Sequence, residues 1–166
     1  MAVDELALRE TMRLWTSGVT VVTTSDGSVR TGMTVSSFTS VSLEPPLILV
    51  CLLKAAETTR LVGRAGVFAV SLLGESYEDI GMQFAGLTDL PPGADRFHGV
   101  ATVTQHTGVP VLADAIAWLD CRVCGAHDGG THTIYVGEVL ATGRLADPAW
   151  PLVWHNRAYR RLVKDA

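Results

Sequence analysis

Apolar residues along the chain come in short runs that alternate with turn residues, a pattern typical of β-strands. Strands are predicted over residues 19–25, 28–35, 47–53, 67–73, 100–104, 115–124 and 133–142. Asp26-Gly27, between the first two runs, predicts a β-hairpin. Helical patterns are restricted to 4–15, capped by Asp4, to 57–62 and to 76–85. Near-regular short strands with peripheral helices predict a mainly β fold, an antiparallel closed or nearly closed barrel, forming one domain over residues 1–166.

Hydroxyl side chains are concentrated in the segment from Thr31 to Pro46, which ends on Pro45-Pro46 before an apolar strand. It contains Thr31, Thr34, Ser36, Ser37, Thr39, Ser40 and Ser42. A hydroxyl-rich bend between two buried strands offers donors, acceptors and free backbone N–H groups to a polar heterocycle. The alternative is a β-arm whose Ser and Thr side chains face water, since Thr favours strands and Ser favours turns. Composition alone leaves both interpretations open.

Composition narrows the class of partner. The chain is 48% hydrophobic and 18% charged, so it carries more apolar surface than an average domain hides, and an oligomer is expected. A net charge of −4 with scattered Lys and Arg disfavours nucleic acid and anionic membranes as partners. The sequence shows neither a run long enough to span a membrane nor the basic and apolar start of a signal peptide. We therefore expect a cytoplasmic protein.

The three cysteines fit a reducing compartment with free thiols. Cys121 and Cys124, with His127 and His132 nearby, raise the alternative of a zinc site or a redox dithiol. In an extended run, residues three apart point to opposite faces, so the two sulfurs are expected to diverge. A second cysteine pair that would complete a tetrahedral site is missing from the sequence, and no metal site is predicted.

Several stretches, taken in order, resemble the flavin reductase-like family, the split-barrel reductases of two-component flavin-dependent monooxygenases. They are G-V-T-V-V-T-T at 18–24, T-V-S-S-F-T-S-V-S-L-E-P-P-L-I-L-V-C at 34–51, Q-F-A at 83–85, R-F at 96–97 and H-T-I-Y-V-G-E-V at 132–139. The resemblance implies a split β-barrel with bound FMN or FAD. It agrees with the lack of a G-x-G-x-x-G turn and of regular βα alternation, which separates this chain from doubly wound dinucleotide-binding folds.

The resemblance also implies which residues contact the flavin. In the family, the positions of Thr34, Val35, Ser36, Ser37 and Ser40 contact the isoalloxazine and ribityl groups, largely through backbone. After the strand that ends in Cys51, Lys54 and the start of the next helix supply positive potential for the flavin phosphate. Ala55 and Ala56 replace the Ser that family members often carry, and Thr58 is the expected substitute. Phe84 and Ala85 are expected to border the flavin.

His132 matches the family position beside the nicotinamide and is the candidate catalytic residue, although Thr131 stands where the family has Asp. His155 and Tyr159 resemble C-terminal residues near the pyridine nucleotide. The function implied is an NAD(P)H:flavin oxidoreductase, with NADH or NADPH reducing FMN or FAD. It would be a homodimer that supplies reduced flavin to a separate monooxygenase. The alternatives are an oxidoreductase that keeps its flavin tightly bound and acts on its own small substrate, a non-catalytic flavin-binding module and a split-barrel interaction protein.

Overall fold

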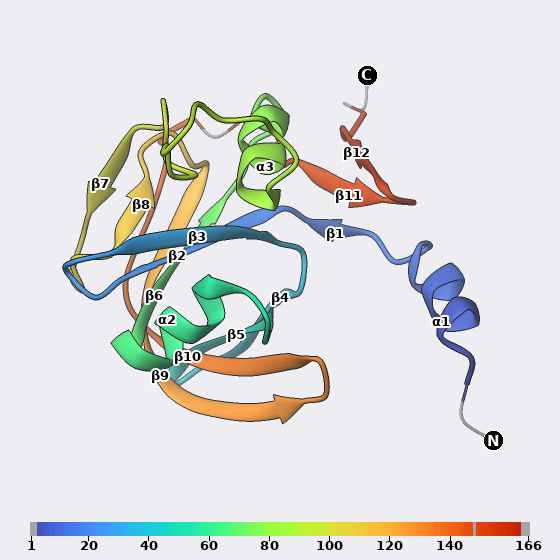
Figure 1. The fold of residues 1–166 in the computed structure, drawn as a ribbon, viewed down its shortest axis with the longest axis horizontal. Coiled ribbons are helices and arrows are strands. Elements are labelled where there is room, and N and C mark those ends of the chain that lie inside the picture. Colours follow the sequence, from blue (N-terminus) through green and yellow to red (C-terminus); the bar gives the residue numbers. More distant parts are fainter. Residues whose placement is uncertain (1–2, 148, 164–166) are drawn as a thin grey trace.

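The computed structural model describes residues 3–147 and 149–163, and most of its regular structure is β-strand (Figure 1). The helices are α1 (Glu5–Met12), α2 (Glu57–Ala65) and α3 (Glu78–Ala85). The strands up to α3 are β1 (Ser17–Gly18), β2 (Thr20–Ser25), β3 (Arg30–Val35), β4 (Phe38–Leu43), β5 (Pro46–Leu53) and β6 (Val67–Leu72). They are followed by β7 (Thr102–Thr104), β8 (Pro110–Leu112), β9 (Ala117–Gly129), β10 (His132–Arg144), β11 (Val153–His155) and β12 (Ala158–Arg160).

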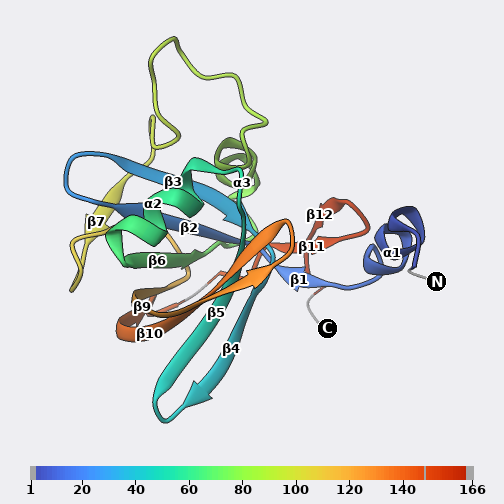
Figure 2. The same cartoon turned by 60° about the horizontal axis from the view of Figure 1, so that its bottom comes forward.

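A seven-stranded antiparallel sheet in the order β3-β2-β6-β9-β10-β5-β4 forms the body of the described chain. Its two edge strands, β3 and β4, are joined by the Ser36–Ser37 bend, and the Cys51 amide donates to the Ser37 carbonyl at 3.0 Å. The chain therefore passes directly from one edge of the curled sheet to the other. The hairpin of β4 and β5 projects from one end of the body (Figure 2). The predicted antiparallel split barrel is confirmed.

The core lies inside the curled sheet, where Val22, Val50, Phe68 and Val70 are fully buried. Gly137 makes room for Phe68, because a Cβ at this glycine would lie 2.5 Å from the phenyl ring. The strands place buried residues at alternate positions. In β5, for example, every second residue is buried, as expected for a sheet with one face toward the core.

The three helices differ in how much they contribute to packing. α2 buries Thr58, Leu61 and Val62 against the barrel. α3 rests on β3, where Gly32 allows the buried Phe84 ring to approach. By contrast, none of the residues of α1, all of which are described, is buried, and α1 lies away from the barrel in both views (Figures 1 and 2). Among the described residues, no helix has the length and apolar character needed to cross a membrane.

The structure corrects three sequence predictions in detail. The bend predicted over Thr31–Pro46 is confined to Ser36 and Ser37 and to the Glu44–Pro45 turn, and the rest of that segment belongs to β3, to β4 and to the start of β5. The first helix ends at Met12 rather than Trp15, with Arg13 as its C-cap. β1, β8, β11 and β12 were not predicted, because strands of two or three residues rarely show a pattern of their own. β7, equally short, lies within the predicted run 100–104.

Candidate active site

Strand β3 borders two clefts, one apolar and one basic. The apolar cleft, of about 240 Å³, includes Thr34 from β3, Ser36 from the bend after it, Ala85 from α3 and Tyr159 from β12. The basic cleft, of about 260 Å³, includes Thr31 near the start of β3, Thr58 from α2, and Arg30 and Arg96. Thr31 and Thr34 are three residues apart in an extended strand, a separation of about 10 Å. The two clefts therefore lie at opposite ends of one strand.

The apolar cleft is walled by aromatic and aliphatic side chains. Tyr159 and Trp154 pack edge to face, with ring centroids 5.1 Å apart, and Val19, Met82 and Leu87 complete the lining. Burial, and to a lesser extent the nearby Glu78 carboxylate, raises the pKa of Tyr159. The phenol therefore stays protonated at neutral pH and keeps its proton for donation. A flat heterocycle is the kind of ligand that such a wall accommodates.

The position of α3 against β3 shapes this cleft. The Thr34 hydroxyl donates to the Gly81 carbonyl at 2.6 Å. On the other side of the same residue, a Cβ at Gly81 would lie 2.8 Å from the Tyr159 hydroxyl oxygen. Gly81 therefore lets α3, β3 and β12 meet at one point, and no larger residue fits there without displacing Tyr159.

The basic cleft is built at the N-terminus of α2. The N-cap, Ala56, has no side-chain acceptor for the N–H groups of the first turn. Thr58 is only 2% exposed, and its hydroxyl lies 3.0 Å from that of Thr31. Arg30 lies 4.4 Å above the Phe97 ring and pairs with Asp95 at 2.9 Å. Helix N–H groups, hydroxyls and guanidinium groups are the donors that phosphate binding requires.

His132 and Cys51 lie on the outer face of the sheet. Alternate residues of β5 face the core, and Leu52 is fully buried, so Cys51 and Leu53 point outward. His132 is opposite Leu53, and Ile134 is opposite Cys51. The His132 Nδ1 atom lies 2.9 Å from the Thr131 hydroxyl oxygen, so Thr131 provides the ring partner at the position where the family has Asp.

Lys54 follows Leu53, the last residue of β5. Its ammonium group pairs with Asp128 at 2.9 Å, and its backbone N–H donates to the Thr131 carbonyl at 3.0 Å. The hydrogen bond and charge of Lys54 lower the pKa of Asp128. Lys54 is two residues before Ala56, which lines the basic cleft. Its ammonium group is paired with Asp128 near the end of the β9–β10 hairpin.

Some residues of the predicted flavin cradle lie elsewhere. Val35 and Phe84 have side chains in the core, with 4% and 0% exposure. Ser40 is exposed on β4, opposite Ile48, and lines neither cleft. The Ser37 hydroxyl donates to the Cys51 carbonyl at 2.7 Å. Like the Thr34 hydroxyl, it uses its proton within the protein, so only its oxygen lone pairs remain for a ligand.

His155, in β11, lies 2.8 Å through Nδ1 from the Thr16 hydroxyl and does not line the apolar cleft. Its neighbour Trp154 does line this cleft, and Trp154 was not predicted as a site residue. Arg30 and Arg96 of the basic cleft were likewise not predicted as site residues. For Trp154, the signal in the sequence was an aromatic residue two positions from a turn and five before Tyr159.

The positions of Cys121 and Cys124 agree with the prediction that their sulfur atoms diverge in an extended strand. Cys121 is fully buried, and Cys124 is exposed. Burial is the main cause that raises the pKa of Cys121 to about 12. The two thiols therefore face different surroundings, as predicted from their spacing.

A split barrel with a ring-sized apolar cleft and an anion-binding helix terminus on one strand defines a class of proteins that bind nucleotide cofactors outside the doubly wound fold. Residues 12–163 match the model of the flavin reductase like domain, and the chain belongs to the flavin reductase-like family.

Individual relatives are similar to this chain over nearly its whole length. An NADH-dependent FAD reductase from Streptomyces globisporus is 39% identical over 98% of this chain and 88% of its own length. The structure of the NADH:FAD oxidoreductase from the same species in complex with NAD and FAD fragments has 36% identity, a TM-score of 0.88, and coverage of 100% of this chain and 99% of that one. BorF, the flavin reductase component of a bacterial two-component tryptophan halogenase, has 35% identity, a TM-score of 0.86, and coverage of 98% and 100%.

Proposed function

We propose that this protein, as a single domain over residues 1–166, is an NADH-dependent flavin reductase that supplies reduced FMN or FAD to a separate monooxygenase. The observation that carries the proposal is the pair of clefts along β3, an apolar one for a ring at Thr34 and a basic one for a phosphate at Thr31, three residues away. The family and the relatives named as NADH-dependent reductases and reductase components support the same activity.

The residues present fit a flavin. The apolar cleft would hold the isoalloxazine ring against Trp154 and Tyr159, with the backbone around Thr34 and Ser36 supplying polar contacts. The first turn of α2 and the Thr58 hydroxyl would hold the phosphate, with Arg30 and Arg96 nearby. A bound flavin supplies the chemistry, because its ring accepts a hydride from a stacked nicotinamide.

The protein side chains would orient the two rings and exclude water. The protonated Tyr159 phenol can donate a hydrogen bond at the edge of the apolar cleft. His132, whose Nδ1 is held by Thr131, would position the nicotinamide through its other ring nitrogen. No strong base or nucleophile is required for hydride transfer between two rings.

We further propose a homodimer located in the cytoplasm. α1 buries none of its residues, and the β4 edge strand exposes Val41 and Leu43 at 51% and 89%. An open strand edge and an unpacked helix are surfaces that a second copy can cover. The three free cysteines fit a reducing compartment.

The activity is tested by anaerobic oxidation of NADH and NADPH with FMN, FAD and riboflavin in turn. We expect NADH to reduce each flavin with equal stoichiometry. Riboflavin should bind at least about tenfold more weakly than FMN, because it lacks the phosphate that the basic cleft is expected to hold. A protein that binds flavin but is not bleached by NADH would instead be a flavin-binding module.

His132→Asn tests the assignment of the nicotinamide position. The KM for NADH should rise, or hydride transfer should slow, by about tenfold or more, while flavin affinity changes little. His127→Asn is the matched control, since His127 is an exposed histidine of the same hairpin, opposite Ile134. If His132→Asn loses flavin binding and keeps normal NADH kinetics at saturating flavin, His132 is a flavin ligand.

A further inference from the structure

Two stretches of the sequence that lie apart along the chain, Q-F-A at 83–85 and R-F at 96–97, meet at the end of α3. The Arg96 guanidinium group donates through Nη1 to the Phe84 carbonyl at 2.7 Å and to the Gly32 carbonyl at 3.2 Å. Phe84 belongs to α3 and Gly32 to β3, and both of these elements border the apolar cleft. One side chain therefore connects two walls of the cleft.

The last turn of α3 offers this arginine both an acceptor and a negative end. The backbone N–H groups of Gly86 and Leu87 donate to two of the last helix carbonyls at 3.0 Å, and Arg96 donates to a third, that of Phe84. α3 has no basic residue in its last turn, so Arg96 supplies the positive charge that a helix C-terminus favours. A Cβ at Gly86 would lie 2.9 Å from Nη2 of Arg96, so glycine lets the guanidinium group lie against the helix end.

Gln83 makes the reverse connection, from α3 to the loop that follows it. Its side-chain Nε2 atom donates to the carbonyls of Arg96 and His98, each at 2.9 Å. Phe97, between these two residues, is 3% exposed and packs edge to face against Phe84, with ring centroids 5.0 Å apart. The loop is thus fixed to α3 by hydrogen bonds in both directions and by an aromatic contact.

The end of α3 forms one wall of the apolar cleft. Met82, Ala85 and Leu87 line the cleft from the helix side, and Thr34 lines it from β3. The Thr34 hydroxyl connects β3 to the middle of α3, whereas Arg96 connects β3 to the last turn of the helix. These two connections fix how far the helix end stands from the strand, and they set the width of the space that a flat ring can enter.

We propose that Arg96 is a positioning residue for the flavin ring, acting through the separation of α3 and β3 at the apolar cleft. This inference rests on the proposed flavin reductase function and names a residue that acts through the backbone rather than on the reacting rings. Arg96 also lines the basic cleft, so a contact with the flavin phosphate is the alternative role. Its Nη1 atom already donates to two carbonyls on different elements, and this geometry favours positioning.

The two roles differ in their effect on a flavin that has no phosphate. Riboflavin carries the ring without the phosphate, and riboflavin and FMN are each titrated into flavin-free protein, with binding followed by flavin fluorescence. Arg96→Met removes the donors and the charge but keeps an unbranched side chain. We expect both flavins to bind about tenfold more weakly, with the ratio of their dissociation constants as in the wild type. Arg122→Met is the matched control, since Arg122 is an exposed arginine that pairs with Glu138 on the barrel wall.

Gln83→Met tests the same connection from the helix side. Gln83 lines neither the apolar nor the basic cleft, so an effect of this variant on flavin binding must pass through the loop and the helix end. We expect riboflavin and FMN to bind about threefold more weakly, a smaller change because the hydrogen bonds of the Arg96 side chain remain. Urea denaturation of each variant measures folding separately. If Arg96→Met does not fold, Gln83→Met decides between the two roles.

A kinetic measurement follows the orientation of the ring. At saturating FMN, stopped-flow reduction by NADH should be slower in Arg96→Met than in the wild type, because hydride transfer requires the two rings to be held in a reactive geometry. The Arg122→Met control should keep the wild-type rate.

Two results would overturn the inference. Weaker binding of FMN with unchanged binding of riboflavin in Arg96→Met would make Arg96 a phosphate ligand. A lower free energy of unfolding with unchanged affinity for both flavins would make its role purely structural. Wild-type protein that binds both flavins but is not bleached by NADH would overturn the proposed function alone, because the affinity test needs no reduction. Wild-type protein that binds no flavin would overturn both.

Discussion

The barrel and the segments that project from it are stabilised in different ways. In the barrel, Phe68, Val70 and their neighbours are fully buried, and the described residues leave no buried side-chain polar atom without a partner. Even the buried Asp120 carboxylate accepts hydrogen bonds from the backbone N–H and the hydroxyl of Thr107. α1, in contrast, is attached to the C-terminal hairpin by the Arg157–Glu10 ion pair and by hydrogen bonds between its C-cap, Arg13, and Asn156, and the β4–β5 hairpin exposes Leu43 near its tip.

This difference separates the parts of the molecule that one chain can complete from those that it leaves open. The free energy gained from apolar burial is proportional to the area removed from water. The barrel therefore gains most of its stability within a single chain. Exposed ion pairs such as those of α1 contribute little. The apolar cleft lies where the two regions meet, between β3 and α3 of the body and Trp154 and Tyr159 of the C-terminal hairpin.

The largest expected effect is in the barrel. Phe68→Ala removes a fully buried ring and should lower the free energy of unfolding by about 3–5 kcal/mol, measured by urea denaturation. Leu8→Ala on α1, where the side chain is 54% exposed, is the matched control and should change it by less than about 0.5 kcal/mol in dilute protein. Equal losses for the two variants would abolish the contrast between the regions.

The second effect concerns assembly. The double variant Val41→Asp, Leu43→Asp places two negative charges on the β4 edge strand, at two exposed positions. If a second copy covers this strand, sedimentation should show a dissociation constant raised about 100-fold or more, with the monomer still folded. The control is Val29→Asp, at the exposed β2–β3 turn. A wild-type protein that sediments as a monomer and reduces flavin at full rate would remove the need for a partner.

The smallest effect compares individual thiols. At neutral pH, Cys121 stays protonated because burial raises its pKa to about 12, and the thiolate is the reactive form. A thiol reagent should therefore modify the exposed Cys124 first, the half-buried Cys51 more slowly, and Cys121 only after unfolding. Mass spectrometry of digested protein gives the order. Labelling of Cys121 at the rate of Cys124 would mean that β9 opens in the native state.

Local patterns determined the strands and helices that are long enough to show them. The continuous apolar run at 47–53 predicted β5, and Asp26-Gly27 predicted the β2–β3 hairpin. The resemblance carried by the segment around Thr34 led to the end of β3, which borders the apolar cleft. These features depend on neighbouring residues in the chain, so a sequence can specify them directly.

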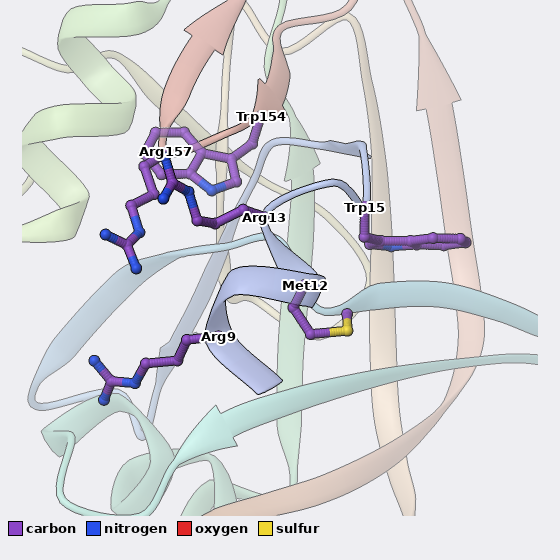
Figure 3. A pocket seen from close by; sticks show the side chains of 6 residues that line it. All are labelled: Arg9, Met12, Arg13, Trp15, Trp154 and Arg157. Atoms are coloured by element: carbon purple, nitrogen blue, oxygen red, sulfur yellow. The ribbon is translucent and has the colours of Figure 1, made fainter. Parts of the chain in front are cut away.

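Tertiary structure alone decided which of the candidate residues share a site. Thr34 and Tyr159 are 125 positions apart in sequence and line one cleft, whereas Ser40, six positions from Thr34, lines neither. Phe84 is in the core because Gly32, on a different element, leaves space for it. The cleft lined by Arg13, Trp154 and Arg157 forms only where the two ends of the chain meet (Figure 3). Contacts between distant residues depend on the register and curvature of the whole sheet, which no local pattern of apolar and polar positions contains.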